Sequence, residues 1–267
     1  MLATFALSMI GIDDLDIYSH VALPVQEIAY GICLVAMITM EAQRPFGSVM
    51  ASGIMPTSRS PLLLLIGMCW AFVSVMVIYF FAKSLGGTFT ALPLSIEVST
   101  IFAVIIFAVG EEVLFRGTIF RALEERFGST AAVLVTSVPF ALVHIYNPGS
   151  SLTSAINVFL AGAALGISVA VTRSLWMAIG FHVLWNVGVA LVFGIVSGMD
   201  LPLNFTSLDT AAIAQSTRWL VEGPFGVEDG LVTSILLVVS MIMMTKLDTF
   251  DPYVQAARNR QRYFIPS

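Results

Sequence analysis

Charged residues are scarce in this sequence of 267 residues. They make up 11% of the chain, against 58% hydrophobic residues, and the mean hydropathy is +0.93. A soluble domain carries about 25% charged residues, so the composition predicts a polytopic helical membrane protein surrounded by a lipid bilayer. The net charge of −5 argues against nucleic acid as a partner.

Cysteine and histidine are also rare. Cys33 and Cys69 each lie inside an apolar run, so we interpret them as small packing residues rather than as a disulfide or metal site. His20, His144 and His182 are the three histidines, and their scarcity makes each position informative. We expect no cleavable signal peptide, because the apolar start has no basic region and runs directly into acidic residues.

Apolar runs of about 20 residues are the units that cross a membrane. We predict an all-α bundle of about seven spans at 21–40, 62–82, from 96 onward, 130–146, 152–172, 175–196 and 231–244. The third span continues as a charged extension that ends at Gly128, as a helix C-cap does. Two pairs of glycines, 162 with 166 and 194 with 198, fit close helix packing.

We divide the chain into three parts. Residues 1–95 hold an interfacial lead and two spans, residues 96–198 form a helical core, and residues 199–267 hold an acidic loop, the last span and a basic tail. Arginine strongly outnumbers lysine, which suggests a GC-rich prokaryotic genome. We therefore expect the protein in a prokaryotic cell membrane.

The basic residues predict the orientation, because cytoplasmic loops are enriched in them. Taking alternate loops from an outside N-terminus places two basic residues outside, Lys83 and Arg218. The other basic residues of the loops and the tail fall on the inner side, namely Arg44, Arg59, Arg121, Arg126, Arg173, Lys246, Arg258, Arg260 and Arg262. We therefore predict an outside N-terminus and a cytoplasmic C-terminus.

Two adjacent carboxylates and an arginine lie at the end of the apolar run 101–109. Ionisable groups at membrane depth are costly and by default mark a functional site. Glu112 and Arg116 are spaced i,i+4, so they can pair on a helix. Glu111 is rotated about 100° from its neighbour and can face a cavity. The alternative is an ion pair that only holds helices together.

Polar residues on two further helices should meet these carboxylates. Glu111 lies 17 residues before Gly128 and His144 lies 16 after it. Antiparallel helices rising about 1.5 Å per residue place both roughly 24–26 Å from the turn. His182 and Asn186 share one face of the sixth span and lie at a similar depth. We therefore predict an active site buried between helices three, four and six.

Two chemistries use such a set of residues. In the first, a buried glutamate helped by a histidine deprotonates water for attack on a peptide carbonyl, and the other histidine and the asparagine stabilise the oxyanion. In the second, Glu111, His144 and His182 bind Zn²⁺, which activates the water. The sequence contains no HExxH motif, and the residue types alone do not separate the two.

Three motifs resemble those of a known family. Glu111-Glu112-x-x-x-Arg116, Phe140-x-x-x-His144 and His182-x-x-x-Asn186 occur in this order in separate apolar segments. They resemble the CPBP family of intramembrane proteases, which includes the type II CAAX prenyl endopeptidases (Rce1-like) and the bacterial Abi proteins. The resemblance covers about residues 96–198.

The resemblance implies an intramembrane endopeptidase that cuts a membrane-anchored or prenylated, CAAX-type protein. Glu111 and His144 would activate the water, His182 and Asn186 would form the oxyanion site, and Arg116 and Phe140 would support them together with Glu112. Which glutamate is the base stays open, as does a metal ion. Two other functions also stay open: an idle scaffold or bacteriocin-immunity-type protein, and a proton-coupled transporter that uses Glu and His as a relay.

Overall fold

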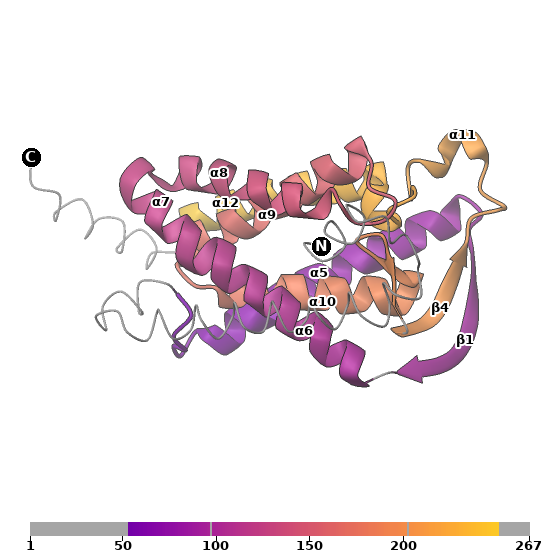
Figure 1. Cartoon of the computed structure of the whole chain (residues 1–267), viewed down its shortest axis with the longest axis horizontal. Coiled ribbons are helices and arrows are strands. Elements are labelled where there is room, and N and C mark those ends of the chain that lie inside the picture. Colours follow the sequence, from indigo (N-terminus) through magenta and orange to yellow (C-terminus); the bar gives the residue numbers. More distant parts are fainter. Residues whose placement is uncertain (1–52, 97, 202, 251–267) are drawn as a thin grey trace, which may run out of the picture.

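The computed structural model describes residues 53–96, 98–201 and 203–250. The first predicted span, the interfacial lead and the basic tail beyond residue 250 lie outside these residues. Within them the chain is mainly helical, which confirms the all-α class (Figure 1). Three helices are long and apolar enough to cross a membrane in the described part: α5 (Ser60–Ser84), α9 (Leu152–Thr172) and α10 (Trp176–Phe193). The total of about seven spans stays a prediction.

The other helices follow the predicted segments closely. The third segment is one continuous helical run made of α6 (Val98–Glu112), the π-helix η2 (Val113–Ile119) and α7 (Phe120–Phe127). It ends at Gly128, whose φ of 82° is the conformation a glycine adopts readily. The fourth segment is α8 (Ser129–His144) and the last is α12 (Leu231–Phe250), both apolar.

The helices form two groups that α6, η2 and α7 connect. α10 packs along α5 and α6, while α9 packs against α8 and α12. Figure 1 shows α8, α9 and α12 together on one side, α5 and α10 on the other, and the run from α6 to α7 crossing between them. The polar residues that this run carries therefore face helices of both groups.

Glycines allow a close helix approach between α5 and α10. A Cβ on Gly67 would come within 2.1 Å of the Met177 carbonyl oxygen, and one on Gly180 within 2.3 Å of the Leu64 carbonyl oxygen. Small residues let two backbones come together in this way. The crossing sets the position of the first turns of α10, just before His182.

The predicted role of the four spaced glycines is half right. A Cβ on Gly162 would come within 3.2 Å of Ser137 of α8, and one on Gly166 within 3.3 Å of Val133, so the two glycines allow close packing of α9 on α8. Gly194 and Gly198 do not pack helices together, so that part of the prediction is wrong. Gly194 instead ends α10 in a left-handed conformation, and Gly198 lies in the following turn against the Pro148 carbonyl.

Two small antiparallel strand pairs, which we did not predict, accompany the helices. β1 (Thr88–Ile96) pairs with β4 (Leu203–Asp209), with Thr88 opposite Asp209. β2 (Ile195–Val196) pairs with β3 (Met199–Asp200) directly after α10. Figure 1 shows the β1–β4 ribbon at the end of the bundle away from the turn between α7 and α8.

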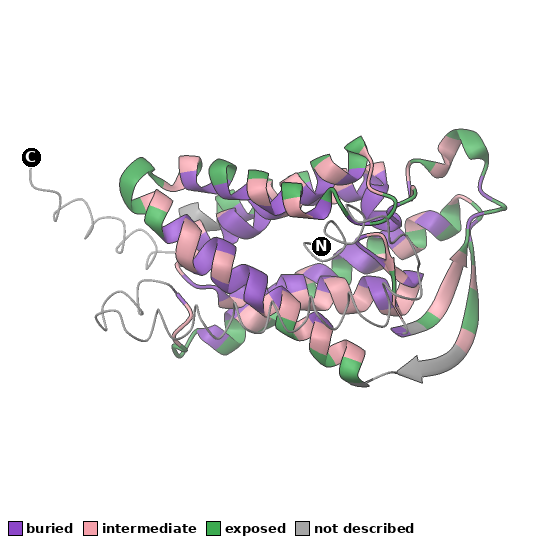
Figure 2. Cartoon of the chain, viewed as in Figure 1, coloured by how far each residue is buried: buried purple, intermediate pink, exposed green. Residues whose placement is uncertain are grey.

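Burial supports a membrane location for the bundle. The residues facing the centre are buried, whereas the outer faces of α5, α8 and α12 expose large apolar side chains (Figure 2). Examples of these exposed residues are Leu62, Phe72, Phe80, Leu134, Val138, Ile235 and Ile242. Contiguous apolar surface of this kind suits contact with lipid rather than with water. The apolar spans and the outward-facing side chains together describe an integral membrane protein. Its orientation stays a prediction.

Candidate functional site

The charged motif lies where the third helical run changes its winding. Glu111 and Glu112 end α6, and Arg116 belongs to the π-helical turns that follow. π-Helical turns occur often at functional sites. The Glu112 and Arg116 side chains are both completely buried, and Arg116 Nη1 donates to Glu112 Oε1 at 2.9 Å. The i,i+4 spacing thus gives the ion pair that the sequence predicted.

Arg116 also connects the neighbouring helices. Its second terminal nitrogen donates to the Gly162 carbonyl of α9 at 3.2 Å. Its guanidinium lies over the Phe140 ring of α8, 4.1 Å from the ring centroid. A desolvated cation over an aromatic face is stabilised by about 2 kcal/mol or more. Arg116 and Phe140 therefore hold η2, α8 and α9 together beside the glutamates.

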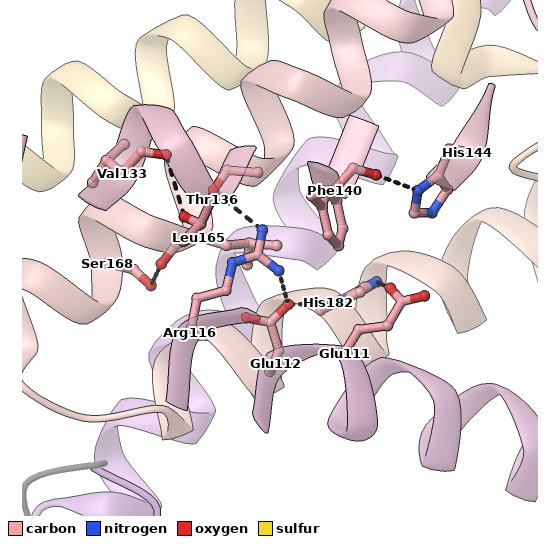
Figure 3. Close-up of polar contacts among 11 residues, drawn as sticks. Glu111, Glu112, Arg116, Val133, Thr136, Phe140, His144, Leu165, Ser168 and His182 are labelled. Carbon is pink, nitrogen blue, oxygen red and sulfur yellow. Dashed lines mark hydrogen bonds and ion pairs between the residues drawn. The ribbon is translucent and has the colours of Figure 1, made fainter. Parts of the chain in front are cut away.

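His182 lies between the two glutamates (Figure 3). Its Nδ1 is 2.8 Å from Glu112 Oε1, and its Nε2 is 3.8 Å from Glu111 Oε2. Glu112 accepts from both Arg116 and His182 through this one oxygen. Since a carboxylate accepts, the bond orients the imidazole with its proton on Nδ1 and its Nε2 toward Glu111.

His144 is oriented by its own helix. Its Nδ1 lies 2.7 Å from the Phe140 carbonyl oxygen one turn earlier. A carbonyl can only accept, so this nitrogen carries the proton and Nε2 keeps a free lone pair. A neutral histidine in this tautomer can accept a proton or a hydrogen bond from water.

One cavity brings residues of α8, α9, α10 and α12 together with the segment between α10 and α12. Its lining is made of Phe140, His144, Asn157, Val158, Ala161, Leu165, Phe181, His182, Trp185, Asn186, Ser197, Glu228, Thr233 and Leu237. The lining is mostly apolar with a few polar groups, as is usual for sites that bind small molecules or side chains. The Asn186 side chain makes no hydrogen bond to another described residue, so its amide is available to a ligand.

The structure brings most of the predicted site together. His144, His182 and Asn186 line the cavity, and Glu111 and Glu112 reach it through His182. Within the described residues no hydrogen bond joins Glu111 to His144; Figure 3 shows the two side chains on the same side of Phe140. The predicted activation of water by Glu111 and His144 therefore requires a water molecule that lies between the two side chains.

Zinc requires three ligands that converge on one point. Glu111, His144 and His182 were the candidates. In the part of the chain that the structure describes, no group of three or more His, Cys, Asp or Glu side chains is arranged to hold a metal ion. Nδ1 of each histidine bonds Phe140 or Glu112 and leaves Nε2 available, so it is the positions of the three side chains that do not suit the metal. The three residues do not fit a zinc site in this arrangement.

Comparison with known families adds an independent finding. The family described as Type II CAAX prenyl endopeptidase Rce1-like matches residues 93–188. This matched region covers α6 to most of α10 and includes every predicted site residue. This part of the chain is therefore similar to CAAX-type intramembrane proteases, in agreement with the three sequence motifs. No curated protein matches the chain.

Sequence reasoning missed several residues of the cavity. Asn157 lies inside an apolar span, a position that itself signals an interhelical hydrogen bond. Glu228 and Ser197 gave no such signal, because they belong to a long polar segment whose path only the structure reveals.

Proposed function

We propose that this protein is an intramembrane endopeptidase that hydrolyses a peptide bond of a membrane-anchored or prenylated protein, with Glu111 as the general base. The observation that carries the proposal is the single cavity shared by His144, His182 and Asn186, with the Glu111 carboxylate against His182. The family supports a protease of the CAAX type.

The contacts favour Glu111 over Glu112 as the base. Glu112 is fully buried and holds both Arg116 and His182. Glu111 is 8% exposed and its nearest charged partner is His182 at 3.8 Å. A general base must be free to reach the proton that it removes. Glu111 satisfies this requirement, whereas Glu112 acts as the charge that positions its neighbours.

The reaction follows from these positions. Glu111 removes a proton from a water molecule that also donates a hydrogen bond to His144 Nε2. The resulting hydroxide attacks the peptide carbonyl carbon, and the negative charge moves to the carbonyl oxygen. Asn186 and the Nε2–H of a protonated His182 donate to this oxyanion, as such donors do in other hydrolases. Glu111 then returns the proton to the leaving amine as the carbon–nitrogen bond breaks.

The imidazolium form of His182 fits its surroundings. With Nδ1 donating to Glu112, the ring can donate from Nε2 only when it is doubly protonated. Two carboxylates lie within 4 Å of its nitrogens, so an imidazolium at this position would have anionic partners. His182 can therefore supply both a hydrogen bond and a positive charge to the oxyanion.

The test is a cleavage assay in detergent or liposomes with farnesylated and transmembrane-anchored peptides. We expect Glu111→Gln and His144→Ala each to lower kcat by about 10²–10⁴-fold without loss of folded protein. Glu125→Gln is the matched control, because Glu125 is an exposed glutamate on α7. Cleavage at the wild-type rate by Glu111→Gln would refute the assignment, and no cleavage of any peptide by the wild type would support a scaffold instead.

A further inference from the structure

The cavity has a second polar wall, which the proposed reaction does not use. Glu228, in the short 3-10 helix η3 (Val227–Asp229), lies there with Asn157 of α9 and Thr233 of α12. His144, His182 and Asn186 line the same cavity. A carboxylate therefore stands in the space where a substrate would bind, outside the set that activates water.

The Glu228 carboxylate is buried and is held by two donors. Trp185 Nε1 donates to its Oε1 at 2.9 Å, and the backbone N–H of Ser197 donates to its Oε2. An indole N–H and a backbone N–H can only donate, so both carboxylate oxygens of Glu228 act as hydrogen-bond acceptors. Trp185 directly precedes Asn186 on α10, which ties this charge to the site.

No cation balances this charge in the described part of the chain. None of the ion pairs between described residues includes Glu228. Glu228 is nevertheless only 8% exposed. A buried carboxylate without a cationic partner is costly, and hydrogen bonds offset only part of the cost. A positively charged group that enters the cavity would supply the missing partner.

The surrounding structure holds Glu228 in place. The Asn157 amide donates to the carbonyl oxygens of Glu228 at 2.8 Å and of Gly230 at 3.1 Å. The Thr233 hydroxyl donates to the Val227 carbonyl at 2.7 Å. Side chains from α9 and α12 therefore fix both ends of η3. Preorganised groups of this kind bind a ligand without first having to be ordered.

We propose that Glu228 is a specificity-determining residue that binds a basic side chain of the substrate, lysine or arginine, beside the scissile bond. This inference rests on the proposed protease function of the same cavity. The uncompensated carboxylate attracts a cationic side chain and repels an anionic one, while its fixed position sets which substrate residue it meets. A site built for a charged group discriminates strongly against analogues that lack it.

The test uses one anchored peptide in three forms, with Lys, Gln or Glu placed in turn at each position flanking the cleaved bond. For the wild type we expect kcat/KM to be about 10- to 100-fold higher for the best Lys peptide than for its Gln form. The Glu form should be the poorest. The Lys-to-Gln ratio should fall to about one in Glu228→Gln. The ratio is compared within each enzyme, so a partial loss of folded protein does not affect it.

Asp229→Asn is the matched control. Asp229 lies in the same 3-10 helix, but its carboxylate accepts from Ser151 and does not line the cavity. This variant should keep the wild-type ratio. A wild-type ratio near one at every position, or an unchanged ratio in Glu228→Gln, would overturn the inference.

Binding distinguishes this inference from the proposed function. If the wild type cleaves none of the peptides, the proposed function fails, and the dissociation constants of the same peptides are measured by fluorescence anisotropy. Tighter binding of the Lys form by the wild type and not by Glu228→Gln would still support the basic-side-chain site. Equal binding of all three forms would overturn it.

Discussion

His182 of α10 and Glu112 of α6 are joined by a 2.8 Å contact between Nδ1 and Oε1. The two residues are 70 positions apart, and the contact is buried. Because the same oxygen of Glu112 also accepts from Arg116, one carboxylate sets the position of a proposed catalytic histidine and balances a buried arginine. The first two predictions concern this connection.

Glu112→Gln should destabilise the protein strongly. Glutamine keeps the size of the side chain but leaves Arg116 as a buried cation without a partner, which costs about 3–5 kcal/mol. Thermal unfolding in detergent measures the change, and Glu125→Gln on the exposed face of α7 is the control. An unfolding temperature equal to that of the wild type would show that the pair carries no net stability.

Arg116→Lys should also be destabilising, although the charge is kept. A lysine is a point charge that cannot bond Glu112 and the Gly162 carbonyl at once while lying flat on Phe140. We expect a loss of about 1–3 kcal/mol from the unpaired group. Arg126→Lys, at an exposed position, should leave the unfolding temperature unchanged. Equal behaviour of the two variants would contradict the prediction.

Gly180→Ala should disrupt the crossing of α5 and α10. The added Cβ would lie 2.3 Å from the Leu64 carbonyl oxygen, a backbone atom that cannot rotate away. The helices must separate, and we expect a loss of several kcal/mol or failure to fold. Gly188→Ala on the same helix meets only a Val75 methyl group at 3.3 Å and is the control. The measurement is the yield and the unfolding temperature of the two variants, and both values should fall only for Gly180→Ala.

Stability should depend on pH through Glu124 at the end of α7. Burial raises the pKa of Glu124, but the hydrogen bond from Ser129 and the charges of Arg173 and Arg121 outweigh it and leave the pKa below its ordinary value of 4.5. Because the folded pKa is lowered, the stabilisation is present above the unfolded value and is lost as pH falls through the folded one.

The measurement is the difference in unfolding temperature between wild type and Glu124→Gln from pH 7 to pH 3.5. We expect the wild type to be the more stable at pH 7. The difference should stay constant down to about pH 5 and shrink below pH 4.5. A difference that stays constant over the whole range would mean that this carboxylate does not contribute in its charged form.

Chelation should leave cleavage unchanged. The described residues contain no group of three side chains arranged to bind a metal ion, and the proposed reaction needs only Glu111, His144, His182 and Asn186. Activity is assayed with and without chelator, and bound metal is measured in wild type and His144→Ala. About one zinc ion per chain, lost together with activity in both treatments, would replace the glutamate mechanism by a metal-bound water.

Local sequence determined the helices because their signals are local. The span predicted at 152–172 is found as Leu152–Thr172, bounded by the Ser151 capping box and by Arg173 in a left-handed conformation. The i,i+4 spacings of Glu112 with Arg116 and of His182 with Asn186 placed each pair on one helix face. The similar distances of Glu111 and His144 from Gly128, 17 and 16 residues, predicted that the two residues lie at a similar depth.

Only the tertiary structure decided the rest, since it depends on segments far apart in the chain. β1 and β4 pair across more than 100 residues, and no local pattern in either strand specifies the other. The free position of Glu111 and the engaged position of Glu112 follow from where α10 places His182. Glu228 faces the cavity because Asn157, Trp185 and Ser197 hold it there, and these contacts exist only once four separate segments have packed.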